Sequence, residues 1–270
     1  MFTKTGEGAL PTPPARHRIV PVPGKHADKA VRARSFGAAA EIYERSRPGY
    51  PDAAVDWLVP EGARTVLDLG AGTGKLTRSL AARGLDVVAV EPLPEMRESL
   101  AAALPEVRTL AGTAEEIPLP DASVDAITVA QAWHWVDPER AKAEAARVLR
   151  PGGTLGVIWN RRDERVGWVA QLSEVMGSAE AEVMDMDAVE IGPPFSPTES
   201  FVAEWNRPMD VDLLVEMAAS RSYVITATPR RRREILDGVR RVVEADPRLG
   251  TEFDFPYRTY CFRAALHAQS

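Results

Sequence analysis

The sequence of 270 residues predicts a parallel, doubly wound α/β sheet. Three observations support this fold class. Short apolar segments alternate with segments of helical spacing, the apolar segments are nearly continuous, and glycine or proline separates the two kinds. Continuous apolar strands are typical of a sheet that helices cover on both faces. Right-handed crossovers between the parallel strands follow as the default.

Two helices are expected before the first strand. Residues 36–43 are small and apolar, with glutamate interspersed, and a proline-rich turn ends this pattern. Asp52 can cap a second helix at residues 53–58, and Gly62 ends it. The expected strands and helices alternate from residue 65 onward.

Each expected strand is a β-branched or apolar run, and each expected helix lies between two such runs. The strands are Thr65–Leu69, 87–90, 107–111, Val124–Ala130 and 154–159, and the helices are 76–83, 94–104 and 138–149. Beyond residue 161 the rhythm changes, because polar and proline-rich residues separate the elements. There we expect helices at Gly167–Met176, 211–220 and 229–244, a loop at 177–198, and strands at 201–205 and 257–263.

The charge of the chain is unevenly placed. Residues 1–34 carry a net charge of +5 and contain five prolines between Pro11 and Pro23, whereas the remaining residues carry −11. We expect 1–34 to be a flexible basic tail. An acidic body repels polyphosphate chains, so the composition disfavours a nucleic-acid partner.

Composition also narrows the chemistry. Cys261 is the single cysteine and there are four histidines, so neither a disulfide framework nor a metal site is expected. The chain has no run of 18 uncharged apolar residues and no apolar leader near its first residue, so we expect a cytoplasmic protein with no membrane partner.

The most informative segment is VLDLGAGTGKLT at residues 66–77, where a strand enters a glycine-rich turn before a helix. Such turns bring backbone N–H groups close to a ligand. A phosphate-binding P-loop would need serine or threonine after Gly74 and Lys75, but Leu76 follows. A dinucleotide fingerprint would need a third glycine where Lys75 stands.

The spacing Gly70-x-Gly72-x-Gly74, preceded by Asp68, instead resembles motif I of the class I S-adenosylmethionine-dependent methyltransferases. This resemblance implies a seven-stranded, mostly parallel Rossmann-like sheet with a helical cap. It also implies an acidic residue after the second strand, and Glu91 follows residues 87–90. A carboxylate there can accept hydrogen bonds from both hydroxyls of a ribose.

Three further segments resemble this family. Residues 111–120 are similar to its loop after the third strand, which contacts adenine, with Thr113 where many relatives have aspartate. YERSRPGYP at 43–51 and QAWHWVD at 131–137 resemble the branch of trans-aconitate and cantharidin methyltransferase-like proteins. In that branch Tyr43 and Arg47 would close over the methionine end of the cofactor, with the Arg47 guanidinium on its carboxylate.

The resemblance therefore implies S-adenosyl-L-methionine as cofactor and methyl transfer to a small molecule, with O-methylation of a carboxylate or hydroxyl expected. The expected cofactor-binding residues are Tyr43, Arg47, Asp68, Gly70, Ala71, Gly72, Glu91, Met96, Thr113, Ala114, Glu115 and Ala130. On this interpretation residues 35–160 form the cofactor-binding core, and residues 161–270 supply cap helices and final strands to the same domain.

His134 is the candidate general base, because it follows the fourth expected strand at the edge where ligands bind in such folds. The alternative is an imidazole that packs between Trp133 and Trp135. Two other functions stay open at this point. They are a dinucleotide-dependent oxidoreductase and a protein that binds the cofactor without turnover.

Overall fold

The computed structural model describes residues 46–177, 185–186 and 189–267. The expected basic tail, the expected helix at 36–43 and Tyr43 lie outside these residues. Within them no helix is long and apolar enough to cross a membrane.

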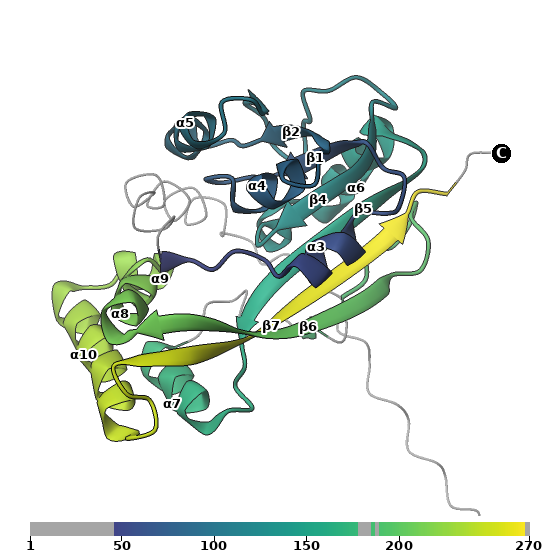
Figure 1. The fold of residues 1–270 in the computed structure, drawn as a ribbon. Coiled ribbons are helices and arrows are strands. Elements are labelled where there is room, and N and C mark those ends of the chain that lie inside the picture. The colour runs from purple at the N-terminus through teal and green to yellow at the C-terminus, as the bar shows by residue number, and fades with distance from the viewer. Residues whose placement is uncertain (1–45, 178–184, 187–188, 268–270) are drawn as a thin grey trace, which may run out of the picture.

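Seven strands form one mixed sheet in the order β3-β2-β1-β4-β5-β7-β6 (Figure 1). They are β1 (Thr65–Leu69), β2 (Asp86–Val90), β3 (Arg108–Leu110), β4 (Val124–Ala130), β5 (Leu149–Arg162), β6 (Glu199–Asp210) and β7 (Glu252–Ala265). The first five strands are parallel, and β7 is antiparallel to both β5 and β6. The predicted fold class is confirmed.

Helices cover both faces of the parallel part of the sheet. The strands there have apolar side chains on each face, and the helices bury them. The described helices here are α3 (Asp52–Leu58), α4 (Lys75–Ala81), α5 (Pro94–Ala103) and α6 (Pro138–Val148). One core joins α3, α4 and α5 to Val66 and Ile158, and a second joins α6 to Leu67 and Val157. Successive residues of a strand therefore serve opposite cores, as the continuous apolar runs predicted.

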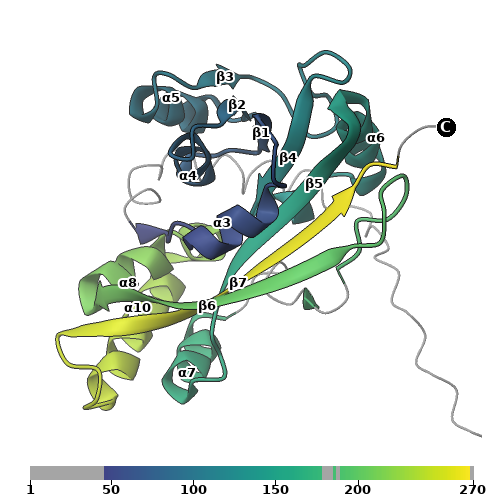
Figure 2. The same cartoon turned by 45° about the vertical axis from the view of Figure 1, so that its right-hand side comes forward.

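A third core lies where β6 and β7 extend beyond the parallel strands (Figure 2). It is built by α7 (Gly167–Met176), α8 (Val211–Ala219), α9 (Ser222–Ile225) and α10 (Pro229–Ala245). Trp168 packs edge-on against Phe253 and Phe255, with ring centroids 5.5 and 5.4 Å apart. These helices occupy the end of the sheet toward which β1, β4 and β5 run.

The strands of the second half are longer than predicted. The strand expected at 154–159 extends over Leu149–Arg162, and those expected at 201–205 and 257–263 extend over Glu199–Asp210 and Glu252–Ala265. Two short elements, α9 and the 3₁₀ helix η1 (Trp133–Trp135), have no counterpart in the prediction. The described part of the expected loop at 177–198 contains one isolated bridge, between Phe195 and Leu266.

Candidate active site

The glycine-rich turn connects β1 to α4 at the carboxyl edge of the sheet. Its glycines Gly70, Gly72 and Gly74 have φ angles of +71°, +59° and +91°, which other residues rarely adopt. The N–H groups of Gly70 and Ala71 donate to the carbonyl of Val90 at 2.8 and 3.1 Å, so the turn is fixed to the end of β2.

The turn is open on one side. A Cβ at Gly72 would meet no heavy atom within 4 Å, whereas one at Gly70 would lie 3.0 Å from the Cβ of Ala132. Gly70 therefore packs against the segment after β4, and Gly72 leaves room for a ligand. This open space beside a glycine turn fits the cofactor that motif I implies.

Glu91 follows β2 and joins this turn directly. Its Oε2 accepts the N–H of Gly72 at 2.8 Å, and its Oε1 accepts the N–H of Leu93 at 2.9 Å. Burial raises the pKa of Glu91, and the two N–H groups and the charge of Arg97 oppose that shift. Each carboxylate oxygen has about two lone pairs, so both can still accept a hydroxyl.

Asp68 occupies a different place from Glu91, inside the protein. Its side chain is 0% exposed, with Oδ2 accepting the hydroxyl of Thr77 at 2.6 Å and Oδ1 accepting that of Thr128 at 3.4 Å. Burial raises the pKa of Asp68 to about 6, against the two hydrogen bonds. The structure thus places Asp68 on β1, where its side chain connects to β4 and α4 below the turn.

The loop after β3 contains the residues that were expected to contact adenine. Thr113 is exposed and pairs with Glu116 through two backbone hydrogen bonds of 3.3 Å, while Ala114 packs in the core. The Oε1 of Glu115 accepts the N–H of Asp137 at 2.8 Å, which ties this loop to the start of α6. Met96 is buried in the first turn of α5.

The segment after β4 bends sharply. Ala130 ends the strand, and Gln131 adopts a φ of +56°, one of two such non-glycine residues described. Its N–H donates to the carbonyl of Ile158 at 2.9 Å, and its amide donates to that of Asn160 at 3.3 Å. Such strained conformations persist where surrounding contacts hold them, often at functional sites.

His134 lies in η1, directly after this bend. Its ring is half-buried and lies 4.9 Å from the ring of Trp135, at an angle of 43°. The structure thus places it at the carboxyl edge, near the end of β4.

Asn160 is a residue of this edge that the sequence did not single out. Its Oδ1 accepts the hydroxyl of Thr259 at 2.6 Å, and its Nδ2 donates to the carbonyl of Gly49 at 2.7 Å. Thr259 accepts in turn the indole N–H of Trp205 at 2.8 Å. This network fixes residues 46–50 against β5. The sequence signal was weak, a polar residue next to an apolar strand.

Arg47 contacts the cap. Its Nε donates to the hydroxyl of Ser220 at 3.0 Å and its Nη2 to the carbonyl of Ser220 at 3.3 Å, at the end of α8. Residues 46–50 thus run from α8 to α3 (Figure 1).

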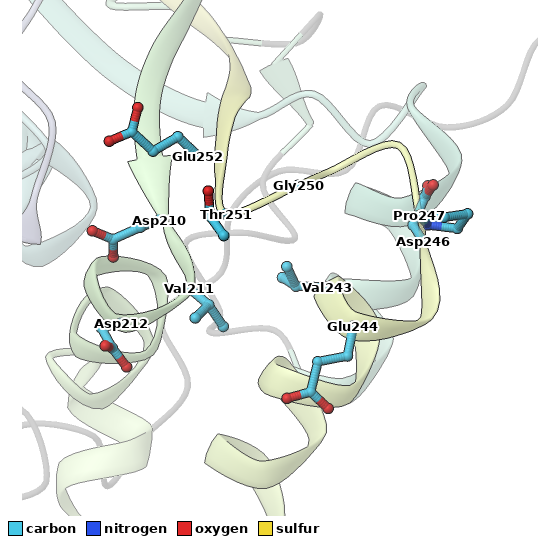
Figure 3. A pocket seen from close by; sticks show the side chains of 10 residues that line it. All are labelled: Asp210, Val211, Asp212, Val243, Glu244, Asp246, Pro247, Gly250, Thr251 and Glu252. Carbon is cyan, nitrogen blue, oxygen red and sulfur yellow. The ribbon is translucent and has the colours of Figure 1, made fainter.

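A hollow of about 600 Å³ lies elsewhere, at the far end of β6 and β7 (Figure 3). Three of its five carboxylates have partners within the protein. Asp210 caps α8 by accepting the N–H of Leu213, Asp212 pairs with Arg240, and Asp246 pairs with Arg248. No group of three metal-binding side chains occurs among the residues that the structure describes.

Comparisons with known proteins agree with this geometry. A family model described as a methyltransferase domain matches residues 67–157. An uncharacterised methyltransferase of Mycobacterium bovis is 54% identical over 234 residues, which are 86% of this chain and 96% of that protein.

Two solved structures share the fold. A candidate type II methyltransferase from Anaeromyxobacter dehalogenans has a TM-score of 0.61 and 26% identity, over 83% of this chain and 99% of that one. An S-adenosylmethionine-dependent methyltransferase from Thermotoga maritima has a TM-score of 0.50 and 22% identity, over 86% and 99%. With the glycine turn and Glu91, these matches show that the chain belongs to the class I methyltransferases, whose cofactor is S-adenosyl-L-methionine.

Proposed function

We propose that this methyltransferase acts on a small molecule in the cytoplasm, by O-methylation of a carboxylate or hydroxyl. One observation carries the proposal. The N–H of Gly72 is hydrogen-bonded to Glu91, the position of a Cβ at Gly72 is open, and the bend at Gln131 follows the next strand. The resemblance of residues 43–51 and 131–137 supports the trans-aconitate and cantharidin branch.

When bound, the cofactor would supply an activated methyl group, carried on a sulfur that can accept the electron pair of the broken bond. The chain holds the reactants in line. Glu91 accepts the ribose hydroxyls, and Gly72, whose N–H holds Glu91, lets the ligand approach the turn. Met96, Thr113, Ala114 and Glu115 would border the adenine end of the cofactor, and Ala130 its centre.

The end of the site that would take the methionine part of the cofactor contains a positive charge, that of Arg47. Arg47 would reach the carboxylate of the methionine part, and its hydrogen bonds to Ser220 set its position beside the cap. We propose the same end for Tyr43, by resemblance alone. Residues 46–50 would exclude water there, since hydrogen bonds of Gly49 with Asn160 and of Arg47 with Ser220 hold them across the edge.

The first test is calorimetric titration with S-adenosylmethionine and its demethylated product, with NAD as the control ligand. Gly72→Val should abolish binding, because its side chain would fill the ligand's space. Gly84→Val is the matched control, since Gly84 also has a positive φ, +73°, and open space. Equal affinity of both variants would exclude the turn as the site, and NAD binding would favour an oxidoreductase.

We propose that His134 takes the proton when the acceptor is a hydroxyl, whereas an ionised carboxylate needs no base. His134→Ala should then lower kcat by about 10²-fold or more at saturating cofactor. His267→Ala is the control, because His267 is exposed beyond β7. An unchanged kcat in His134→Ala would leave the packing role between Trp133 and Trp135.

A further inference from the structure

Asn160 lies at the carboxyl edge of the sheet, just past the end of the parallel strands. The pairing of β5 with β4 ends at Ala130 and Ile158, and β5 continues beside β7 to Arg162. Asn160 is on this extension, where it pairs with Thr259 of β7. Its side chain is half-buried, so it can contact both the strands and the segment that crosses the edge.

A short chain of contacts connects Asn160 to the glycine-rich turn. A Cβ at Gly70 would lie 3.0 Å from the Cβ of Ala132, so the turn packs against the segment after β4. Gln131, the residue before Ala132, donates its side-chain amide to the carbonyl of Asn160 at 3.3 Å. The Nδ2 of Asn160 donates in turn to the carbonyl of Gly49 at 2.7 Å. The turn, the bend after β4 and the segment that contains Gly49 are thus joined through Asn160.

The hydrogen bonds of Asn160 have a fixed direction. The indole N–H of Trp205 can only donate, and it donates to the hydroxyl oxygen of Thr259 at 2.8 Å. The hydroxyl of Thr259 donates to the Oδ1 of Asn160 at 2.6 Å. The Nδ2 of Asn160 is therefore the group that faces Gly49, where it matches a carbonyl. Aspartate at this position would place a second oxygen against that carbonyl.

The segment that Asn160 holds is also anchored at both ends. At its start the carbonyl of buried Ser46 accepts a hydrogen bond from Arg207 of β6, and at its end Tyr50 packs against the core that contains α3. Between these ends Pro48 restricts the backbone. A stiff segment with fixed ends needs one contact at its middle to orient it, and the amide of Asn160 provides that contact.

We propose, resting on the methyltransferase function above, that Asn160 is a positioning residue for the cofactor. It acts through Gly49, by holding residues 46–50 beside the glycine-rich turn. Arg47, which would bind the carboxylate of the methionine part, lies on the same segment. Loss of the hydrogen bond to Gly49 lets this segment open more often, so the bound cofactor dissociates faster.

The test compares Asn160→Asp with the wild type in the full chain. Aspartate is close to asparagine in size and still accepts the hydroxyl of Thr259, but it cannot donate to Gly49. The dissociation constants of S-adenosylmethionine and its demethylated product, measured by calorimetry, should rise roughly ten-fold. Asn206→Asp is the matched control, because Asn206 is exposed on β6 and the substitution adds the same charge. It should bind both ligands as the wild type does.

Hydrogen exchange separates positioning from a general loss of stability. In Asn160→Asp without ligand, exchange should become faster in the peptide that covers residues 46–50, while peptides from β1 and α10 keep their rates. Faster exchange over the whole chain would show that Asn160 only stabilises the fold, and would overturn the proposal. So would unchanged exchange of residues 46–50, or equal cofactor affinity of Asn160→Asp and Asn206→Asp.

A second pair of variants tests the same positioning without added charge. Thr259→Ser keeps the hydroxyl that orients the amide of Asn160, whereas Thr259→Val removes it. The serine variant should therefore bind the demethylated cofactor more tightly than the valine variant, and equal binding would contradict the proposal. A wild type that binds neither form of the cofactor would instead overturn the methyltransferase site, and the exchange of residues 46–50 would still show whether Asn160 holds them.

Discussion

Two buried threonines on neighbouring strands differ in whether their hydroxyl groups form hydrogen bonds. The hydroxyl of Thr259 connects Asn160 to Trp205, whereas that of Thr154 has no hydrogen-bond partner among the described residues. Thr259→Val should lower the free energy of unfolding by about 1–3 kcal/mol, because the half-buried polar groups of Asn160 and Trp205 lose their partner. Thr154→Val should leave it unchanged or raise it. Denaturant titration measures both, and equal losses would contradict this account.

Asp68 gives the protein a specific pH dependence. Its pKa is raised to about 6 in the folded state from an ordinary 3.8, so the folded chain holds this proton more tightly than the unfolded chain. Its contribution to stability is therefore greatest below about pH 4 and falls as the pH rises through 6. Relative to Asp68→Asn, the wild type should lose on the order of 2–3 kcal/mol between these limits.

Urea titrations across this pH range measure the difference between the two proteins. The comparison with Asp68→Asn removes the opposite contributions of carboxylates whose pKa is lowered, such as Asp125 and Asp163. A difference that does not change with pH would show that Asp68 titrates normally.

At the scale of the element, α3 lies so close to β5 that no side chain fits between them. A Cβ at Gly156 would lie 2.7 Å from the Cδ1 of Leu58. Gly156→Ala should thus lower the free energy of unfolding by about 1–3 kcal/mol, since overpacking displaces the helix. Gly167→Ala is the matched control, because a Cβ at this helix start meets nothing within 4 Å. Thermal unfolding of both variants measures the two losses. Equal losses would show that the contact between Leu58 and Gly156 is not tight.

The elements differ in how well the sequence predicts them. β1 and β4 have the predicted bounds, because both are buried on two faces and end at a turn. The edge strand β6 extends from 199 to 210, and seven of its twelve residues are exposed, so its pattern lacked an apolar run. The start of β7 could have been predicted before residue 257, since Phe253 and Phe255 alternate with exposed residues.

At the scale of the whole molecule, the sheet topology creates contacts between distant residues that motif spacing did not predict. The sequence placed Gly72 and Glu91 at one edge, but their direct hydrogen bond depends on how β1 and β2 are joined. The contacts of Asn160 with Gly49, of Arg47 with Ser220 and of Arg207 with Ser46 join residues more than 100 positions apart. No local pattern encodes such contacts, because they form only when β6 and β7 return beside β5.

The part of β5 that extends past the end of β4 fixes the distance between the cofactor edge of the sheet and the cap. Because β5, β7 and β6 carry unbroken pairing from the cofactor edge into the cap, the separation between the two is set by a count of strand residues.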